Sequence, residues 1–212
     1  MTPASFRFSF IARSLAAAAL LAVGTGAAQA AAAIGQPAPA FTGVDTAGQR
    51  VSLADHRGKT VVLEWINPGC PYVRKHYGAA NMQATQKAAV DKGVVWLSIN
   101  STATDATDYL PPERMAAWMK EQKAAATATV MDVDGRIGRA YGARTTPHLY
   151  VIDSKGTLVY AGAIDNRPTA RAADIAGATN HVQAALAEVL AGRSVSVPAT
   201  QPYGCTIKYS AM

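Results

Sequence analysis

Two nearly continuous apolar segments constrain the fold of this chain more than any other feature. They are residues 60–66 (TVVLEWI) and residues 93–100 (GVVWLSIN). A run without regular polar alternation is typical of a strand that is buried on both faces of a parallel sheet. Neighbouring parallel strands need a long crossover connection, usually a helix. We therefore expect an α/β fold with a central sheet and helices on both of its faces.

The segments around these two strands complete the pattern of elements. The hydrophobic periodicity and the turn residues predict a hairpin before them, and strands, helices and a second hairpin after them. The expected hairpins are 41–45 with 50–53 and 148–153 with 157–162, the further strand is 127–131, and the helices are 72–87, 113–124, 136–141 and 179–191. The order predicts one mixed sheet with an N-terminal hairpin extension and a proline-containing C-terminal tail.

The first thirty residues have the features of a secretory signal peptide. Arg7 and Arg13 precede a short apolar run, and the segment ends in Ala28-Gln29-Ala30, an Ala-x-Ala cleavage pattern. The alternative is a membrane anchor, but the run is interrupted by Gly24 before it reaches the roughly 20 residues that a span requires. We expect cleavage after Ala30 and a periplasmic or secreted protein without a stable membrane span.

Composition then excludes several classes of protein. The chain has 212 residues, 16% of them charged and 50% hydrophobic, and it contains two cysteines. Two cysteines exclude a disulfide-stapled miniprotein and a four-cysteine metal site within one chain. No Lys/Arg cluster interleaved with aromatic residues is present, so we expect no nucleic-acid partner. The remaining chain is expected to form one domain over residues 31–192 and a tail over residues 193–212.

The first cysteine stands where a reactive thiol is expected. Cys70 lies between the apolar run 60–66 and the predicted helix, in the sequence Asn67-Pro68-Gly69-Cys70-Pro71. The free N–H groups and the dipole of a helix start favour an anion such as a thiolate. Arg74 and Lys75 follow within about one turn and add positive potential. The alternative is an inert buried cysteine.

Three sequence matches then resemble one family. Residues 35–63 are similar to the opening of redoxin domains of the alkyl hydroperoxide reductase/thiol-specific antioxidant (AhpC/TSA) branch of the thioredoxin-like superfamily. The stretch from Val62 to Val73 resembles the active-site strand and loop of secreted thioredoxin-like proteins. Thr145-Thr146-Pro147 resembles the cis-proline loop of the family. The three occur in the family's order, between about residues 34 and 190. The resemblance implies a thioredoxin-like fold and redox chemistry at Cys70.

The motifs depart from both activities of that superfamily. Thioredoxins carry a second cysteine three residues after the first, where this chain has Val73. Peroxiredoxins place Thr or Ser three residues before their reactive cysteine, where this chain has Asn67. A bacterial peroxiredoxin subgroup has its resolving cysteine at the position of Lys75. The sequence therefore leaves two enzyme classes open, a thiol–disulfide oxidoreductase and a thiol peroxidase.

Cys205, in the tail, is the second candidate catalytic residue. Three interpretations remain open: a resolving thiol for Cys70, a permanent structural disulfide with Cys70, or a thiol that stays free or pairs between chains. An even number of cysteines in an exported protein favours pairing. The structural disulfide would make the chain a non-enzymatic binding module of the thioredoxin fold.

Glu64 is the third candidate catalytic residue. It precedes Cys70 by six positions, the offset of the buried acid in thioredoxin-like proteins. A carboxyl group on an apolar strand should have a raised pKa, in the range useful for proton transfer. We expect Glu64 to relay a proton to or from a reacting thiol. The alternative is a Glu64 that points outward at the strand end and pairs with a lysine.

The resemblance also implies where a substrate binds. We expect a cis bond before Pro147, and we expect Thr146, Pro147 and Pro71 to contact the substrate. The backbone of Thr146 would pair with an extended segment. Arg144 could instead serve a peroxide-reducing thiolate.

The expected partners are protein thiols or disulfides, or a small peroxide. His76 and His148 do not have the spacing of a zinc site with Cys70, so no metal and no cofactor is expected.

Overall fold

The computed structural model describes residues 1–2 and 31–211 of the chain. The predicted signal peptide and its cleavage site at Ala30 therefore lie outside the described residues, apart from residues 1 and 2. The described helices include none that is long and apolar enough to cross a membrane.

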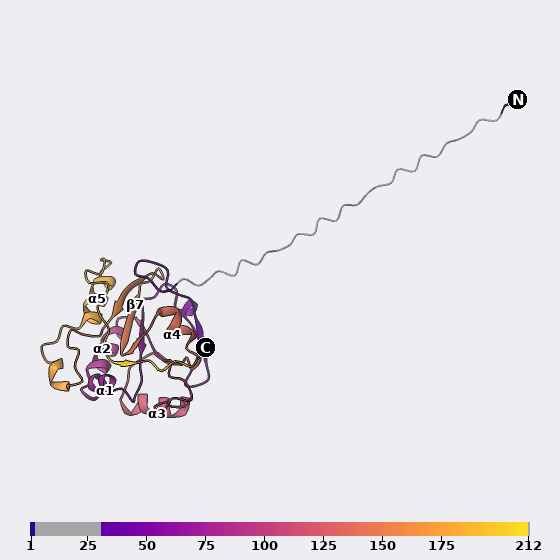
Figure 1. Ribbon diagram of the computed structural model, residues 1–212. Coiled ribbons are helices and arrows are strands. Elements are labelled where there is room, and N and C mark those ends of the chain that lie inside the picture. The colour runs from indigo at the N-terminus through magenta and orange to yellow at the C-terminus, as the bar shows by residue number, and fades with distance from the viewer. Residues whose placement is uncertain (3–30, 212) are drawn as a thin grey trace.

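A seven-stranded mixed sheet forms the centre of the molecule (Figure 1). Its strands are β1 (Thr42–Asp45), β2 (Arg50–Ser52), β3 (Val61–Trp65), β4 (Val95–Asn100), β5 (Ala128–Met131), β7 (His148–Ile152) and β8 (Leu158–Gly162). Their order is β2-β1-β5-β4-β3-β7-β8, and β3, β4 and β5 are parallel neighbours. The predicted α/β fold with a mixed sheet is confirmed. The predicted N-terminal hairpin adds to one edge of this sheet through β1 and β5.

The helices cover both faces of the sheet, as expected. They are α1 (Pro71–Gly78), α2 (Asn81–Val90), α3 (Pro112–Glu121), α4 (Arg136–Tyr141) and α5 (His181–Leu190). Two short 3-10 helices, η1 (Leu53–His56) and η2 (Ala172–Ile175), lie in the connections. One apolar core contains side chains of α1, α2 and α5, and a second core on the other face contains side chains of α4. Figure 1 shows α1, α2 and α5 on one side of β7 and α4 on the other.

The strand β3 explains why the apolar run has no alternation. All five of its residues are buried, because Val61, Leu63 and Trp65 enter one core while Val62 enters the other. Glu64 alternates with Leu63 and Trp65, and so faces the same side as Val62. This is the side that carries α1, the helix that starts at the candidate cysteine.

The single helix expected over residues 72–87 is instead two helices. The chain breaks at Ala80, which has a left-handed conformation with φ of 57°. The α1 end is closed by the backbone N–H of Ala79, which donates to the Lys75 carbonyl at 3.2 Å. The Gln83 side chain donates to the Tyr77 carbonyl at 2.8 Å and so satisfies an orphan group at this break. Gly78, the last residue of α1, is the local sign of the break, because glycine is unfavourable within a helix, whereas Ala79 and Ala80 give none.

The C-terminal tail crosses the molecule, and we call residues 198–210 the strap. Its first part lies along the open edge of β8, where Ala199 bridges Ala161 and the Ala161 N–H donates to the Pro198 carbonyl at 3.0 Å. The strap then forms β9 (Cys205–Thr206) and pairs with β6 (Thr145–Thr146). The yellow C-terminal segment of Figure 1 follows this path towards α4. The tail therefore covers a sheet edge.

Candidate functional site

Cys70 is the N-cap residue of α1, immediately after the loop that follows β3. Pro71 occupies the first helical turn and is exposed. Proline suits this position because the N–H that it lacks would have no partner within the helix. The positive dipole end of α1 lies at Cys70, and the Cys70 side chain makes no capping hydrogen bond to the helix. Cys70 itself is only 2% exposed, because other parts of the chain cover it.

The side chain of Asn67 holds the cysteine loop in shape. Its Oδ1 accepts from the Gly69 N–H at 2.7 Å, while its amide donates to Thr102 Oγ1 at 3.1 Å and to Asp108 Oδ2 at 3.0 Å. Gly69 is required here because a Cβ atom would lie 2.9 Å from the Cβ of Asp108. Asn67 marked a departure from peroxiredoxins in the sequence. The structure shows that its hydrogen-bonding capacity is used to build the loop.

The predicted cis bond between Thr146 and Pro147 is present. This loop faces Cys70, whose thiol donates to the Thr146 carbonyl at 3.0 Å. The Thr146 hydroxyl is buried and has no hydrogen-bond partner in the described part of the chain. Three predicted site residues, Cys70, Thr146 and Pro147, therefore lie together.

The strap occupies the position where an extended substrate was expected. Cys205 pairs with Thr146 and Thr206 with Thr145, in antiparallel register. Cys205 packs against the apolar core that contains Cys70, and both cysteines are free thiols. Burial, together with the neighbouring Cys70, raises the pKa of Cys205 to about 12. The structure thus brings the two cysteines together, and the backbone of Thr146 is paired with the chain's own tail.

Gly204 allows this close approach. Its φ is 138°, and a Cβ atom at this position would lie 2.0 Å from the Thr146 carbonyl oxygen. No other residue fits this backbone at this separation. The Gly-Cys pair of the tail is therefore shaped to the cis-proline loop.

Glu64 is fully buried on the same face of the sheet as Cys70. Its Oε1 accepts from the Tyr77 hydroxyl at 2.9 Å, and its Oε2 accepts from Trp96 Nε1 at 2.7 Å. Gln86 and Ser98 also donate to Oε2. Burial raises the pKa of Glu64 and the four donors oppose the shift. The alternative of an outward-pointing Glu64 paired with a lysine is wrong, since the partners are neutral donors from α1, α2 and β4.

A buried polar cluster beside α1 holds the strap residue Tyr203, and sequence reasoning missed it. The Tyr203 hydroxyl lies 2.5 Å from Asp165 Oδ1 and 3.1 Å from His76 Nε2. Tyr72 and Lys75 contact the Tyr203 ring. We call Tyr72, Lys75, His76 and Asp165 the Tyr203 socket. A polar loop before residue 167 and a histidine in a helix were the available signals, but nothing in the sequence joins them.

The other charged residues near the cysteine have structural partners. Arg74 Nε donates to the Pro68 carbonyl at 2.7 Å, and Lys75 Nζ donates to the Arg167 carbonyl at 2.8 Å. His148 is buried against Tyr150, and burial with the nearby Arg144 lowers its pKa to about 4. Within the described residues, no group of three or more His, Cys, Asp or Glu side chains could hold a metal ion.

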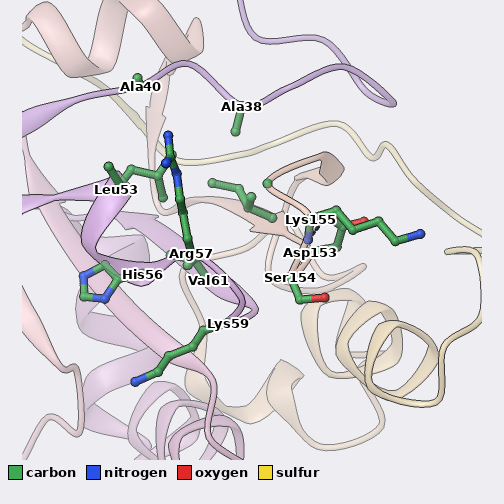
Figure 2. A pocket seen from close by; sticks show the side chains of 13 residues that line it. Ala38, Ala40, Leu53, His56, Arg57, Lys59, Val61, Asp153, Ser154 and Lys155 are labelled. Atoms are coloured by element: carbon green, nitrogen blue, oxygen red, sulfur yellow. Dashed lines mark hydrogen bonds between the residues drawn. The ribbon is translucent and has the colours of Figure 1, made fainter.

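A basic surface pocket lies far from this site along β3. Figure 2 shows Arg57 and Lys59 with Asp153 and Lys155 around it. The pocket is also lined by Val61, the first residue of β3, whereas Cys70 follows the last residue of that strand. It therefore opens at the opposite end of the sheet from the cysteines.

Comparisons with known proteins agree with this geometry. Residues 34–161 match the AhpC/TSA family. A protein of Pseudomonas aeruginosa named thiol:disulfide interchange protein DsbE is 27% identical over 138 residues, which cover 63% of this chain and 69% of that protein.

Two solved structures are similar in fold. A hypothetical protein of Sinorhizobium meliloti has a TM-score of 0.72 and 26% identity, and the match covers 85% of this chain and 96% of the other. The thioredoxin domain of a thiol-disulfide oxidoreductase of Bacteroides vulgatus has a TM-score of 0.50 and 25% identity, with 68% and 96% covered.

Proposed function

The chain belongs to the AhpC/TSA family, and from that premise we propose that it is an exported thiol–disulfide oxidoreductase. Cys70 is the attacking thiol and Cys205 resolves the mixed disulfide. The signal-like N-terminus supports export to the periplasm or the medium. The name of the Pseudomonas aeruginosa relative, a thiol:disulfide interchange protein, supports the reaction class.

The observation that carries the proposal is the contact between the two thiols across the cis-proline loop. Cys70 lacks a neighbour for a Cys-x-x-Cys motif, because the position three residues on is Val73. The strap brings the missing thiol from a distant part of the chain to the same residue, since Cys70 donates to the Thr146 carbonyl and Cys205 pairs with Thr146 in the β6–β9 ladder. A two-cysteine cycle therefore needs no partner chain.

The reaction follows as two exchanges. The Cys70 thiolate attacks one sulfur of a client disulfide, forming a Cys70–client disulfide and releasing the other client sulfur as a thiolate. Cys205, deprotonated, then attacks the Cys70 sulfur and releases the second client thiolate. The two protons of the original thiols finish on the client, which gains two electrons, and the enzyme holds a Cys70–Cys205 disulfide. Run in reverse, the same steps oxidise a client dithiol.

The order of attack has an electrostatic basis. Burial is the largest cause of the raised pKa of Cys205, and the neighbouring Cys70 raises it further. The contribution of Cys70 disappears when its sulfur is bound in a mixed disulfide. Cys205 therefore becomes easier to deprotonate at the step that needs its thiolate.

Three further roles belong to the proposal. Glu64 relays a proton for the exchanging thiols from its buried position on the α1 side of the sheet. Thr146 and Pro147 align the client segment, and the exposed Pro71 borders it. Replacing Glu64 by Gln should remove one titration from the pH–rate profile while the protein stays folded; an unchanged profile would exclude the relay.

Insulin reduction by a dithiol reductant tests the function directly. Cys70→Ser should abolish the catalysed rate, and Cys205→Ser should lower it at least about tenfold and accumulate Cys70–client disulfides. The matched control moves the thiol along the tail: Cys205→Ser with Ser194→Cys should not recover activity. Catalysis by Cys70→Ser at the wild-type rate would disprove the proposal, and peroxide consumption faster than insulin reduction would favour a thiol peroxidase.

Non-reducing peptide mapping tests the resolving role. After mild oxidation, we expect a Cys70–Cys205 peptide as the main disulfide product. If that peptide is absent while both cysteines are oxidised in other forms, Cys205 does not resolve Cys70.

A further inference from the structure

The strap presents two side chains to α1, and only one of them is the cysteine. Tyr203 and Cys205 stand on either side of Gly204, whose φ of 138° lies outside the strand region, and both side chains pack against the core that contains α1. Cys205 meets Cys70 at the N-terminus of α1, while Tyr203 meets Tyr72 and His76 farther along the same helix. Gly204 between them lies against the cis-proline loop.

The Tyr203 socket is built for a hydroxyl group. The amide of Asn81 donates to His76 Nδ1 at 2.8 Å, so the proton of the neutral ring lies on Nε2. Burial keeps His76 neutral by lowering its pKa to about 4. His76 Nε2 therefore donates to the Tyr203 oxygen at 3.1 Å, and the Tyr203 hydroxyl donates to Asp165 Oδ1 at 2.5 Å. A phenol hydroxyl accepts the hydrogen bond from His76 and donates one to Asp165 at the same time.

The socket also needs an occupant. Asp165 is only 2% exposed, and its Oδ2 has no hydrogen bond within the described residues. Lys75 Nζ and His76 Nε2 lie 3.8 and 3.9 Å from that oxygen. Lys75 is also 5.5 Å from the centre of the Tyr203 ring, and the Tyr72 ring packs edge-on against it at 5.8 Å. An aliphatic or phenylalanine side chain would leave His76 Nε2 without its acceptor and Asp165 Oδ1 with only the Arg167 N–H at 2.8 Å, which is costly in a buried site.

A client segment that reacts with Cys70 must pair with Thr146 in the same register as the strap. Its sulfur must reach Cys70, and its backbone must pair with Thr146, which is where Cys205 now lies. If the client has a glycine immediately before its cysteine, as the strap has Gly204, the residue two positions before that cysteine falls on the Tyr203 socket. The strap and the client segment cannot both pair with Thr146, so the client segment leaves this loop, still joined to Cys70 by its disulfide, before Cys205 returns to attack.

We propose that the Tyr203 socket is the specificity pocket of the enzyme, and that it selects clients with a Tyr-Gly-Cys sequence at the reactive cysteine. The strap, Tyr-Gly-Cys-Thr, is then an internal copy of the client sequence. This inference rests on the proposed function, because it assigns the substrate class of the same Cys70 site.

Peptides with an activated cysteine test the pocket on the full chain. The enzyme is the Cys205→Ser protein, and the peptides are Ala-X-Gly-Cys-Thr, with X as Tyr, Phe or Ala. The peptide cysteine is a mixed disulfide with 2-nitro-5-thiobenzoate. The Cys70 thiolate attacks the peptide sulfur, the S–S bond breaks, and the coloured thiobenzoate thiolate leaves. Its release is followed by absorbance, and the peptide adduct on Cys70 by mass.

We expect the Tyr peptide to react about tenfold faster than the Phe peptide, with the Ala peptide slowest. Adding Asp165→Asn should remove the Tyr-over-Phe preference. Adding Tyr203→Phe, which weakens only the strap, should accelerate all three peptides and keep their order. If the Asp165→Asn protein does not fold, the order of the three peptide rates on the Cys205→Ser protein, with and without Tyr203→Phe, still tests the pocket.

Equal rates for the Tyr and Phe peptides, with normal adducts on Cys70, would overturn the pocket and leave the proposed function intact. Release of thiobenzoate at the same rate from the Cys70→Ser protein would overturn both.

Discussion

Glu64 is a fully buried carboxyl group on which four donors converge. Tyr77, Gln86, Trp96 and Ser98 all direct a hydrogen to it, and they come from three different elements. A charge or polar group is tolerated in such a place only when its hydrogen-bonding capacity is satisfied. The residue therefore has a structural role that is separate from the proton relay proposed for it.

Two substitutions of Glu64 should differ in stability for this reason. Glu64→Gln keeps an oxygen for the donors at Oε2 and loses the acceptor for Tyr77, so we expect a cost of about 1–2 kcal/mol. Glu64→Leu removes the acceptor of all four donors, of which only Gln86 keeps another, the Tyr77 hydroxyl at 2.9 Å, and should cost at least about 3 kcal/mol. Urea unfolding measures both, with Ser98→Ala as a control that removes one donor only. Equal stability of the Leu and Gln proteins would contradict this explanation.

The buried histidines predict how stability depends on pH. Burial lowers the pKa of both His76 and His148 to about 4 in the folded protein, while the unfolded value is about 6.5. Between these values the unfolded chain binds more protons, so stability falls as the pH falls from about 6.5 towards 4. Each histidine contributes a loss of up to about 3 kcal/mol at pH 4.

The measurement is urea unfolding at intervals from pH 7 to pH 4.5. In the His148→Asn protein the slope of stability against pH should be shallower than in the wild type. Glu64, whose pKa is raised by burial, contributes with the opposite sign and is the same in both proteins. An identical slope would show that His148 does not remain neutral in the folded state.

At the scale of elements, the break between α1 and α2 depends on an alanine in an unfavourable conformation. Ala80 has φ of 57°, which costs a non-glycine residue about 1 kcal/mol or more. Ala80→Gly should therefore stabilise the protein by up to about 1 kcal/mol. The neighbouring Ala79→Gly, at φ of −94°, should destabilise it instead. Thermal unfolding of the pair tests this, and two changes of the same sign would refute it.

The strap is the element that controls access to Cys70. Gly204→Val places side-chain atoms where the Thr146 carbonyl already lies, so the strap must leave the cis-proline loop. We expect Cys70 to be alkylated by iodoacetamide at least about tenfold faster than in the wild type. Gly192→Ala is the matched control, since Gly192 also has a positive φ but has open space around it. Unchanged alkylation of the Gly204→Val protein would show that the strap does not cover Cys70.

At the scale of the whole molecule, the proposed disulfide would join the strap to the start of α1. The loop between Cys70 and Cys205 contains about 135 residues, and closing a loop of that size restricts the unfolded chain strongly. We expect the oxidised protein to be more stable than the reduced one by about 2–4 kcal/mol. Urea unfolding with and without a reductant measures the difference. The Cys205→Ser protein should show none, and a wild type that is insensitive to reductant would contradict the pairing.

The sequence predicted the sheet well because its strands carry period-2 or fully apolar patterns. The apolar runs around Leu63 and Leu97 could be assigned as buried strands from their composition alone. Cys70 could be assigned as the candidate reactive cysteine from its position after the first run. The Tyr203 socket could not be predicted, since it joins α1, the loop at Asp165 and the tail, and no local pattern links them. The path of the strap was equally hidden, because residues 198–210 have no periodicity and are held by distant partners.

The edge of β8 has a consequence for the open form of the enzyme. The strap that covers Cys70 also hydrogen-bonds along β8, at Pro198, Ala199 and Thr200. An uncovered edge strand offers unpaired backbone groups to any other chain. If the strap detaches as far as residue 198, each client enters while the sheet is briefly able to add a foreign strand. A short open lifetime would then protect the protein from self-association as well as speed its turnover.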